Sequence, residues 1–345
     1  MSPHVEGWPI PANRRCAIAD SVFAIPPTQS DWVGVGLPRK DIAVPRKWDK
    51  GTVAVHREFR VLVATDGSAA AKAAVATAAR FPWPARTRAL GITARQVPRE
   101  YRLSILLTAL DRSAEVVAAG ARRALSRRWP ETDVTIVDTA PIAAVLNAAK
   151  RFEADAIVLG WRGHGSVRRI LIGSVSRGVV RGATCAVLVV RRPQLNVHRI
   201  VIGFDGSANA QRAVEFVRKL HPPRGGHVTV FTSVDHMGVP SHALASRGIG
   251  ATVAAEVRRI NAERTARATK EMARARATLV RAGWRVRTSV TAGEPLSDLL
   301  ASADSADADL LVVGARGASG VRHLLLGSVA EGALNRCPVP VLVVR

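Results

Sequence analysis

An internal duplication constrains the fold of this chain more than any other sequence feature. The phrase RVLVATDGS at Arg60–Ser68 returns as RIVIGFDGS at Arg199–Ser207. Farther along, Asp155–Arg191 aligns without gaps on Asp309–Arg345, and 17 of the 37 positions are identical. Self-similarity at this level indicates two copies of one structural unit.

The spacing of the two matches predicts the domain organisation. The first match has an offset of 139 residues and the second an offset of 154, so the second copy holds 15 extra residues around 234–290. We predict one domain over residues 59–195 and another over 196–345. Residues 1–58 scatter tryptophans among prolines without periodicity, and we expect an irregular extension, partly disordered or upstream of the natural start.

Each copy alternates apolar, β-branched runs with Ala-rich helical segments. This alternation predicts an α/β fold with two tandem five-stranded, mainly parallel, Rossmann-like sheets and helices on both faces. A long helix is expected at about 103–128 and at about 250–282, and prolines 141 and 295 open a shorter one. The expected strands are 61–65, 89–93, 134–137, 156–159 and 186–190, then 200–204, 227–232, 285–290, 310–313 and 339–344.

Composition narrows the class of protein. Hydrophobic residues make up 48% and charged residues 22%, as in a globular protein with a packed core. Cys16, Cys185 and Cys337 lack the CxxC spacing of a zinc or redox centre, which predicts reduced thiols. Since neither a signal peptide nor an apolar membrane span is apparent, we expect a cytoplasmic protein that does not enter membranes.

The net charge of +23 is the unusual total. Residues 1–59 hold 8 Lys and Arg against 6 Asp and Glu, so the excess lies in the repeats and not in a basic tail. A positive surface attracts nucleotides, nucleic acids and acidic proteins alike. Nucleic-acid binding stays an alternative, but no aromatic stacking platform favours it.

The glycine-rich loops carry the chemistry. Both copies read Gly-x2-Gly-x9-Gly-Ser after the fourth strand, at Gly160 to Ser174 and at Gly314 to Ser328. Asp66 and Asp205 end the first strands, so they reach the same edge of the sheet. Such loops turn several N–H groups toward one anion, and a helix N-terminus adds a favourable dipole, which together predict phosphate binding.

With the Asp-Gly-Ser strand ends, this pattern resembles the ATP-binding motif of the universal stress protein family, over about residues 60–345. The resemblance implies an adenine-nucleotide α-hydrolase-like fold with one ATP per repeat, with or without Mg²⁺, and dimer-like pairing through the last strands. It assigns no metal ligand. The nucleotide-binding residues that it implies are Asp66, Gly160, Arg162, Gly163, His164, Gly165, Gly173, Ser174 and Val175 in the first copy, and Gly203, Asp205, Gly314, Arg316, Gly317, Ser319, Gly320, Gly327, Ser328 and Val329 in the second.

Some of these assignments have a competing interpretation. Arg162 and Arg316 are equally compatible with a phosphate contact and with a solvated loop charge. His164 has no histidine at the matching position of the second copy, which favours a surface residue. The first copy departs from the family pattern because Thr139 replaces the glycine found at 293 and because Trp161 brings a bulky side chain to the loop.

The function that we expect is ATP-dependent regulation rather than catalysis. Walker A, GxGxxG and Gly-x-Ser-x-Gly patterns are missing, and no evident general base is available, so hydrolysis should be slow at most. A partner protein would read the nucleotide state, and the chain would be a monomer with pseudo-dimeric repeats or a homodimer. The alternatives are a weak ATPase or nucleotide-using enzyme of this fold, and a basic interaction protein without nucleotide.

Overall fold

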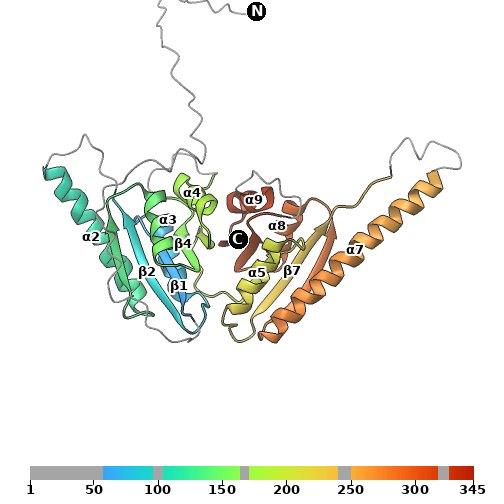
Figure 1. Cartoon of the computed structure of the whole chain (residues 1–345), viewed down its shortest axis with the longest axis horizontal. Helices are drawn as coiled ribbons and strands as arrows, with labels where there is room; N and C mark the ends of the chain where they lie inside the picture. The colour runs from blue at the N-terminus through green and yellow to red at the C-terminus, as the bar shows by residue number, and fades with distance from the viewer. Residues whose placement is uncertain (1–56, 96–103, 164–170, 240–249, 318–325) are drawn as a thin grey trace, which may run out of the picture. The chain divides into compact units, whose positions relative to one another are not determined.

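The computed structural model describes residues 57–95, 104–163, 171–239, 250–317 and 326–345. The chain divides into two compact units, Met1–Asp41 and Ile42–Arg345. The first unit lies outside the described residues, and so does nearly all of the predicted extension over 1–58. Every element below belongs to the second unit (Figure 1).

Strands and helices alternate in both copies, as the sequence predicts. The first copy holds β1 (Phe59–Ala64), α1 (Ala69–Arg80), β2 (Thr87–Ala94), α2 (Ser104–Ser126), β3 (Asp133–Val137), α3 (Pro141–Arg151), β4 (Ala156–Gly160), α4 (Ser174–Gly182) and β5 (Ala186–Val190). The second holds β6 (Arg199–Gly203), α5 (Ala208–Lys219), β7 (His227–Val234), α7 (Gly250–Arg281), β8 (Arg285–Ala292), α8 (Pro295–Ser305), β9 (Leu310–Gly314), α9 (Ser328–Arg336) and β10 (Val341–Val344).

The strands form one sheet of ten, in the order β3-β2-β1-β4-β5-β10-β9-β6-β7-β8. Neighbouring strands within each copy are parallel, which confirms the predicted fold class. The last strands pair in an antiparallel manner, with Val341 opposite Val189 and Val343 opposite Val187. This pairing, which we call the seam, joins the two expected five-stranded halves into a continuous sheet. The predicted boundary at 195/196 lies between β5 and β6 and stays a prediction.

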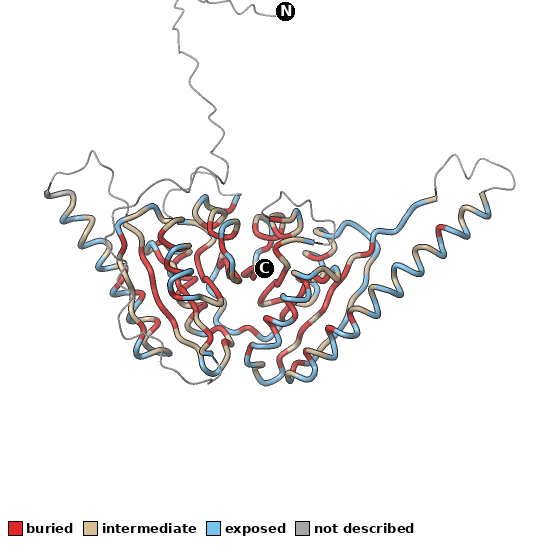
Figure 2. Tube along the Cα trace, in the orientation of Figure 1, coloured by how far each residue is buried: buried red, intermediate tan, exposed pale blue. Residues whose placement is uncertain are grey.

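Helices cover both faces of the sheet because the strand side chains alternate between two apolar layers. Val61 and Val63 belong to a layer that also holds buried residues of α1, α2, α5 and α7, whereas Leu62 belongs to the layer on the other face, with residues of α3, α4, α8 and α9. Each layer contains residues of both copies. Figure 2 shows the buried residues concentrated along the strands, as expected for a parallel sheet covered on both sides.

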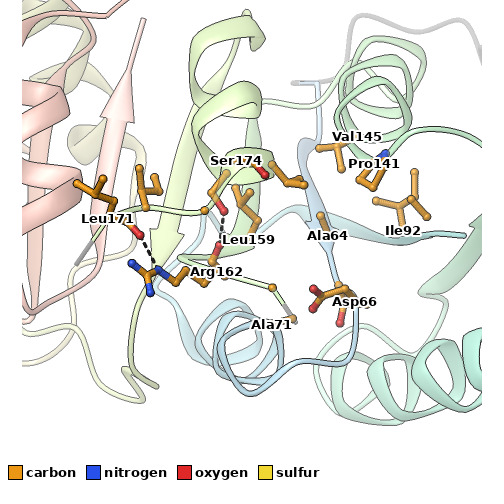
Figure 3. A pocket seen from close by; sticks show the side chains of 18 residues that line it. Ala64, Asp66, Ala71, Ile92, Pro141, Val145, Leu159, Arg162, Leu171 and Ser174 are labelled. Carbon is orange, nitrogen blue, oxygen red and sulfur yellow. Dashed lines mark hydrogen bonds between the residues drawn. The ribbon is translucent and has the colours of Figure 1, made fainter. Parts of the chain in front are cut away.

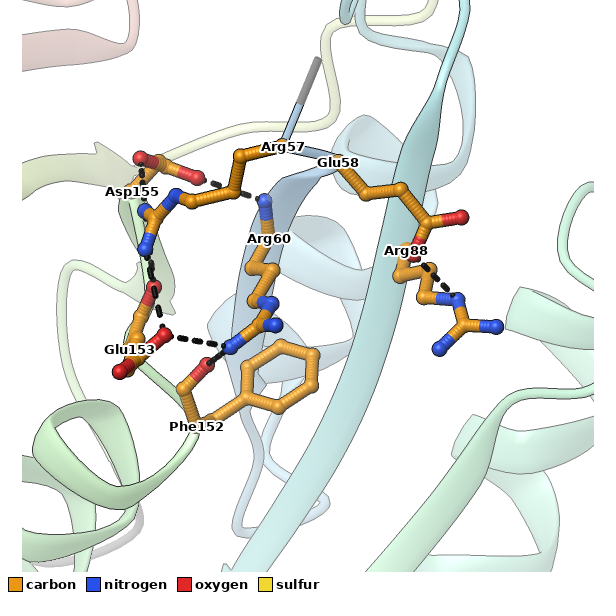
Figure 4. A network of polar contacts seen from close by, with 7 residues as sticks. All are labelled: Arg57, Glu58, Arg60, Arg88, Phe152, Glu153 and Asp155. Carbon is orange, nitrogen blue, oxygen red and sulfur yellow. Dashed lines mark hydrogen bonds and ion pairs between the residues drawn. The ribbon is translucent and has the colours of Figure 1, made fainter. Parts of the chain in front are cut away.

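Carboxylates cap the amino-terminal edge of the sheet in both copies. Asp155 Oδ2 accepts a hydrogen bond from Arg60 N at 2.8 Å, and Asp155 Oδ1 accepts one from Arg57 Nη2 at 2.6 Å (Figure 4). In the second copy Asp309 Oδ2 accepts from Arg199 N at 2.9 Å. These bonds fasten β1 to β4 and β6 to β9 at the amino-terminal edge. The glycine-rich loops follow β4 and β9 and therefore lie at the opposite, carboxyl edge.

Candidate functional site

Each first strand ends in a tight turn that fixes an aspartate at the carboxyl edge. Asp66 Oδ1 accepts from Ser68 N at 3.0 Å, and Ser68 Oγ accepts from Ala71 N at 3.2 Å, which caps α1. Gly67 has φ of +78°, a conformation that side chains other than glycine's rarely adopt. The Asp205-Gly206-Ser207 turn repeats this geometry, with bonds of 3.0 and 3.1 Å and φ of +76°.

The glycine-rich loops approach these turns so closely that a side chain would not fit. A Cβ on Gly163 would lie 2.2 Å from Asp66 Oδ2, and one on Gly317 would lie 2.6 Å from Asp205 Oδ2. A Cβ on Gly160 would lie 2.6 Å from the backbone of Ala70 in α1. The glycines therefore bring the loop backbone against the aspartate, as a backbone-lined ligand site requires.

The last helix of each copy begins directly after its loop. Gly173 N donates to Trp161 O at 2.9 Å and Gly327 N to Ala315 O at 2.8 Å, so each loop closes before its helix starts. The N-cap residues of α4 and α9 are Gly173 and Gly327, which supply no side-chain cap. Ser174 and Ser328 are exposed first residues of these helices. Uncapped N–H groups of a first turn, together with the helix dipole, favour an anion.

In the first copy these parts enclose a cavity of about 770 Å³, a volume typical of small-molecule sites. Seven predicted residues line it, namely Asp66, Gly160, Arg162, Gly163, Gly173, Ser174 and Val175. Figure 3 shows Asp66 and Ser174 at separate places on the wall, with the apolar side chains of Ala64, Ile92, Pro141 and Val145 beside them. The cavity thus has an apolar wall and a backbone-rich wall.

Sequence reasoning missed the apolar wall. Ile92 comes from β2, and Pro141 and Val145 come from α3, so these residues are far from both motifs in sequence. The sequence indicates a place in the site for these residues only through their position, which is at the carboxyl end of a strand or on the helix that follows a strand. Ser176 was missed as well: its buried hydroxyl donates to Gly160 O at 2.7 Å and fastens α4 to the end of β4.

The second copy brings the corresponding predicted residues together on the same elements. Gly203 ends β6, Asp205 follows it, Gly314 ends β9, and the loop residues Arg316 and Gly317 come next. Arg316 O accepts from Asn209 Nδ2 at 3.1 Å, which holds the loop against α5. Gly327, Ser328 and Val329 begin α9. The predicted residues His164, Gly165, Ser319 and Gly320 lie outside the described residues.

Arg162 lies along the rim of the first cavity with its guanidinium engaged. Its Nε donates to Leu171 O at 2.5 Å, and its guanidinium carbon lies 4.3 Å from the centre of the Trp161 ring. Arg191 lies over the same ring at 3.7 Å. Trp161 is therefore turned toward these arginines, and it is not among the described residues that line the cavity.

The fold and the site define an open, doubly wound α/β protein with glycine-rich loops at the carboxyl edge of its sheet. The sequence profile of the universal stress protein family matches residues 59–191 and again residues 196–345. The chain therefore belongs to the universal stress protein family, which confirms the resemblance carried by its motifs.

The chain is also similar to individual proteins and solved structures. A universal stress protein of Mycobacterium tuberculosis is 29% identical over 243 residues, which cover 66% of this chain and 72% of the relative. The crystal structure of a universal stress protein from Archaeoglobus fulgidus covers 83% of this chain and 98% of its own, with a TM-score of 0.58 and 20% identity, a likeness of fold. A universal stress protein solved in complex with cAMP is 24% identical and covers 39% of this chain and 97% of its own, with a TM-score of 0.31.

Two further properties concern membranes and metals. Within the described segments no helix is long and apolar enough to cross a membrane. The same segments contain no cluster of three or more His, Cys, Asp or Glu side chains placed to hold a metal ion.

Proposed function

We propose that the chain binds ATP, one molecule in the first cavity and one at the matching place in the second repeat. The supporting observation is the cavity of about 770 Å³ with two chemically different walls. A purine suits the apolar wall of Ile92, Pro141 and Val145. Phosphates suit the start of α4 at Gly173 and Ser174, where N–H groups and the helix dipole favour negative charge.

The turn aspartate supplies the third element of recognition. Its Oδ1 accepts a hydrogen bond from Ser68 N, and Gly163 lets the loop backbone approach its Oδ2 because glycine lacks a Cβ. A carboxylate at this place can accept a hydrogen bond from a ribose hydroxyl. In our proposal Asp66, and Asp205 in the second copy, select the nucleoside, while the loop and helix hold the phosphates.

We propose that the protein regulates rather than catalyses, and that it does so in the cytoplasm. ATP would favour one arrangement of the loops, and a partner protein would read that arrangement. Hydrolysis would be slow, because γ-phosphate chemistry needs a residue that orients the attacking water, and none of the predicted site residues has that role. The paired repeats would act as a pseudo-dimer within one chain.

Binding is tested with the variant Gly163→Val. A Cβ at position 163 would lie 2.2 Å from Asp66 Oδ2, so the valine side chain collides with the carboxylate. Titration calorimetry with ATP should detect two sites in the wild type, and affinity at the first should fall more than about ten-fold in the variant, a change of about 1.4 kcal/mol. Gly317→Val should do the same at the second site. Gly120→Val is the matched control, since a Cβ on Gly120 meets nothing within 4 Å.

Mass analysis of nucleotide retained on purification supplies an independent measurement. ATP recovered from the wild type and reduced in the double variant Gly163→Val, Gly317→Val agrees with the proposal. The proposal would be overturned if the purified protein retained no adenine nucleotide and also bound none that was added at millimolar concentration. Steady phosphate release that is well above that of the double variant would instead point to a nucleotide-using enzyme.

A further inference from the structure

The glycine-rich loop of the first repeat is attached to the second repeat. The neck of this loop consists of Trp161, Ile172 and Gly173, and it is closed by the bond from Gly173 N to Trp161 O. Trp161 Nε1 donates to Leu334 O at 2.7 Å, and Ile172 N donates to Asn335 Oδ1 at 3.1 Å. Both acceptors lie in the last turn of α9. The two sides of the neck are therefore bound to one helix end of the other repeat.

The end of α9 is well fixed as an anchor. Asn335 Nδ2 donates to Glu331 O at 2.9 Å, which orients the amide so that its oxygen faces Ile172. Arg191 Nη2, from the residue after β5, donates to Asn335 O at 2.8 Å. Cationic groups are favoured at a helix C-terminus, where carbonyl groups lack partners. The antiparallel pairing of β5 with β10 holds this helix end in register with the neck.

Within the described residues, the corresponding neck of the second repeat lacks the two bonds that Trp161 and Ile172 make. The offset of 154 places Ala315 at the position of Trp161 and Arg181 at the position of Asn335. Alanine has no side-chain donor, and an arginine side chain has no acceptor. Arg181 instead pairs with Glu331 at 3.0 Å. Among the described residues, two counterparts remain: Gly327 N donates to Ala315 O, and Arg345 Nη2 donates to Arg181 O at 2.8 Å, as Arg191 does to Asn335 O.

We propose that Trp161 and Asn335 are positioning residues through which the second repeat organises the first nucleotide site. This inference rests on the proposed function, because the neck holds the loop and the start of α4 to which we assign the phosphates. A neck and a helix start that are already held in place lose less conformational freedom on binding, and affinity rises accordingly. The first site then depends on α9, whereas the second site does not depend in the same way on α4.

The test uses substitutions that remove single hydrogen bonds. Trp161→Phe deletes the indole N–H but keeps an aromatic ring for Arg162 and Arg191. Asn335→Leu deletes the acceptor for Ile172 N, and Asn335→Asp restores an acceptor oxygen there. Asn147→Leu, at an exposed position on α3, is the matched control for an Asn-to-Leu change on a helix. All four are made in the full chain carrying Gly317→Val, so that only the first site is titrated with ATP.

We expect Trp161→Phe and Asn335→Leu each to weaken ATP binding about ten-fold, mainly through faster dissociation. Asn335→Asp should recover most of the loss, and Asn147→Leu should bind as the parent does. The inference is overturned if both Trp161→Phe and Asn335→Leu bind ATP as tightly as the Gly317→Val parent, with unchanged thermal unfolding. It is also overturned if Asn335→Asp binds ATP as weakly as Asn335→Leu. If the wild-type chain binds no nucleotide at all, the proposed function fails instead, and the two failures are distinguishable.

Discussion

At the scale of single residues, the two thiols in the described part of the chain flank the seam. Cys185 directly precedes β5, and Cys337 follows the last residue of α9. Burial raises the pKa of the Cys185 thiol to about 11 and also raises the pKa of the Cys337 thiol. Because the thiolate is the reactive form, both residues should be poor nucleophiles near neutral pH.

This placement predicts slow alkylation of the native protein. In a Cys16→Ser variant at pH 8, iodoacetamide should modify Cys185 and Cys337 much more slowly in the native protein than in urea, as followed by intact mass. The native rate should keep rising with pH above 9, where an ordinary thiol is already ionised, and level off near the pKa of about 11 for Cys185. Equal native and unfolded rates at pH 8 would contradict the assignment of protonated, buried thiols.

Some residues of the site could be predicted from local sequence, whereas others reach the site only through the tertiary fold. Gly163 and Asp66 could be predicted from the sequence. Gly163 stands where the backbone approaches too closely for a side chain, and Asp66 is a carboxylate at the end of a predicted strand. Ile92 and Val145 are not readable, because apolar residues in strands and helices look alike whether they face a core or a cavity. In the sequence Trp161 is a bulky departure from the family pattern, and in the structure its indole donates to Leu334 O in the other repeat.

At the scale of elements, α1 shows how one side chain serves helix and site together. Ser68 is 6% exposed, its hydroxyl caps α1 through Ala71 N, and it also donates to Arg162 O at 3.3 Å. The same helix presents the backbone against which Gly160 packs. Loss of this cap therefore affects both the helix and the position of the glycine-rich loop.

We expect Ser68→Ala to lower the free energy of unfolding by about 0.5–2 kcal/mol, the usual effect of removing an N-cap. Ser207→Ala should have a similar effect through α5, where Ala210 N donates to the hydroxyl at 3.1 Å. Urea denaturation provides the measurement. Ser126→Ala is the control, since that exposed hydroxyl bonds Arg122 O late in α2, and a change above about 0.5 kcal/mol there would show that caps are not the cause.

Element positions followed from the sequence because propensity and burial agree in this fold. The predicted strand 156–159 appears as Ala156–Gly160, whose residues are all buried, and the predicted helix over 250–282 appears as Gly250–Arg281. The predicted strand 89–93 is longer in the structure, Thr87–Ala94, because its pairing with β1 and β3 extends it beyond the apolar run. Pairing partners are tertiary information, which local propensity does not contain.

At the scale of the whole second unit, the seam makes one core out of two repeats. Leu188 lies opposite Leu342 at the centre of the antiparallel pair, and both are fully buried. The repeats also meet through Phe59 and Phe216, whose ring centres are 5.7 Å apart in an edge-to-face arrangement. Sequence periodicity predicts two sheets but cannot join them, and the expectation that the last strands pair came from the family resemblance.

A continuous core predicts that the two repeats unfold together. We expect a single calorimetric transition whose midpoint coincides with that of far-ultraviolet circular dichroism, as a cooperative unit requires. Leu342→Ala should lower the free energy of unfolding by about 2–5 kcal/mol, the cost of a cavity in a packed core, and should move the whole transition. Leu195→Ala, at a side chain 44% exposed in the β5–β6 connection, should change it by less than about 0.5 kcal/mol. Two separate transitions, of which Leu342→Ala shifts only one, would mean that the seam joins the strands without coupling the stability of the repeats.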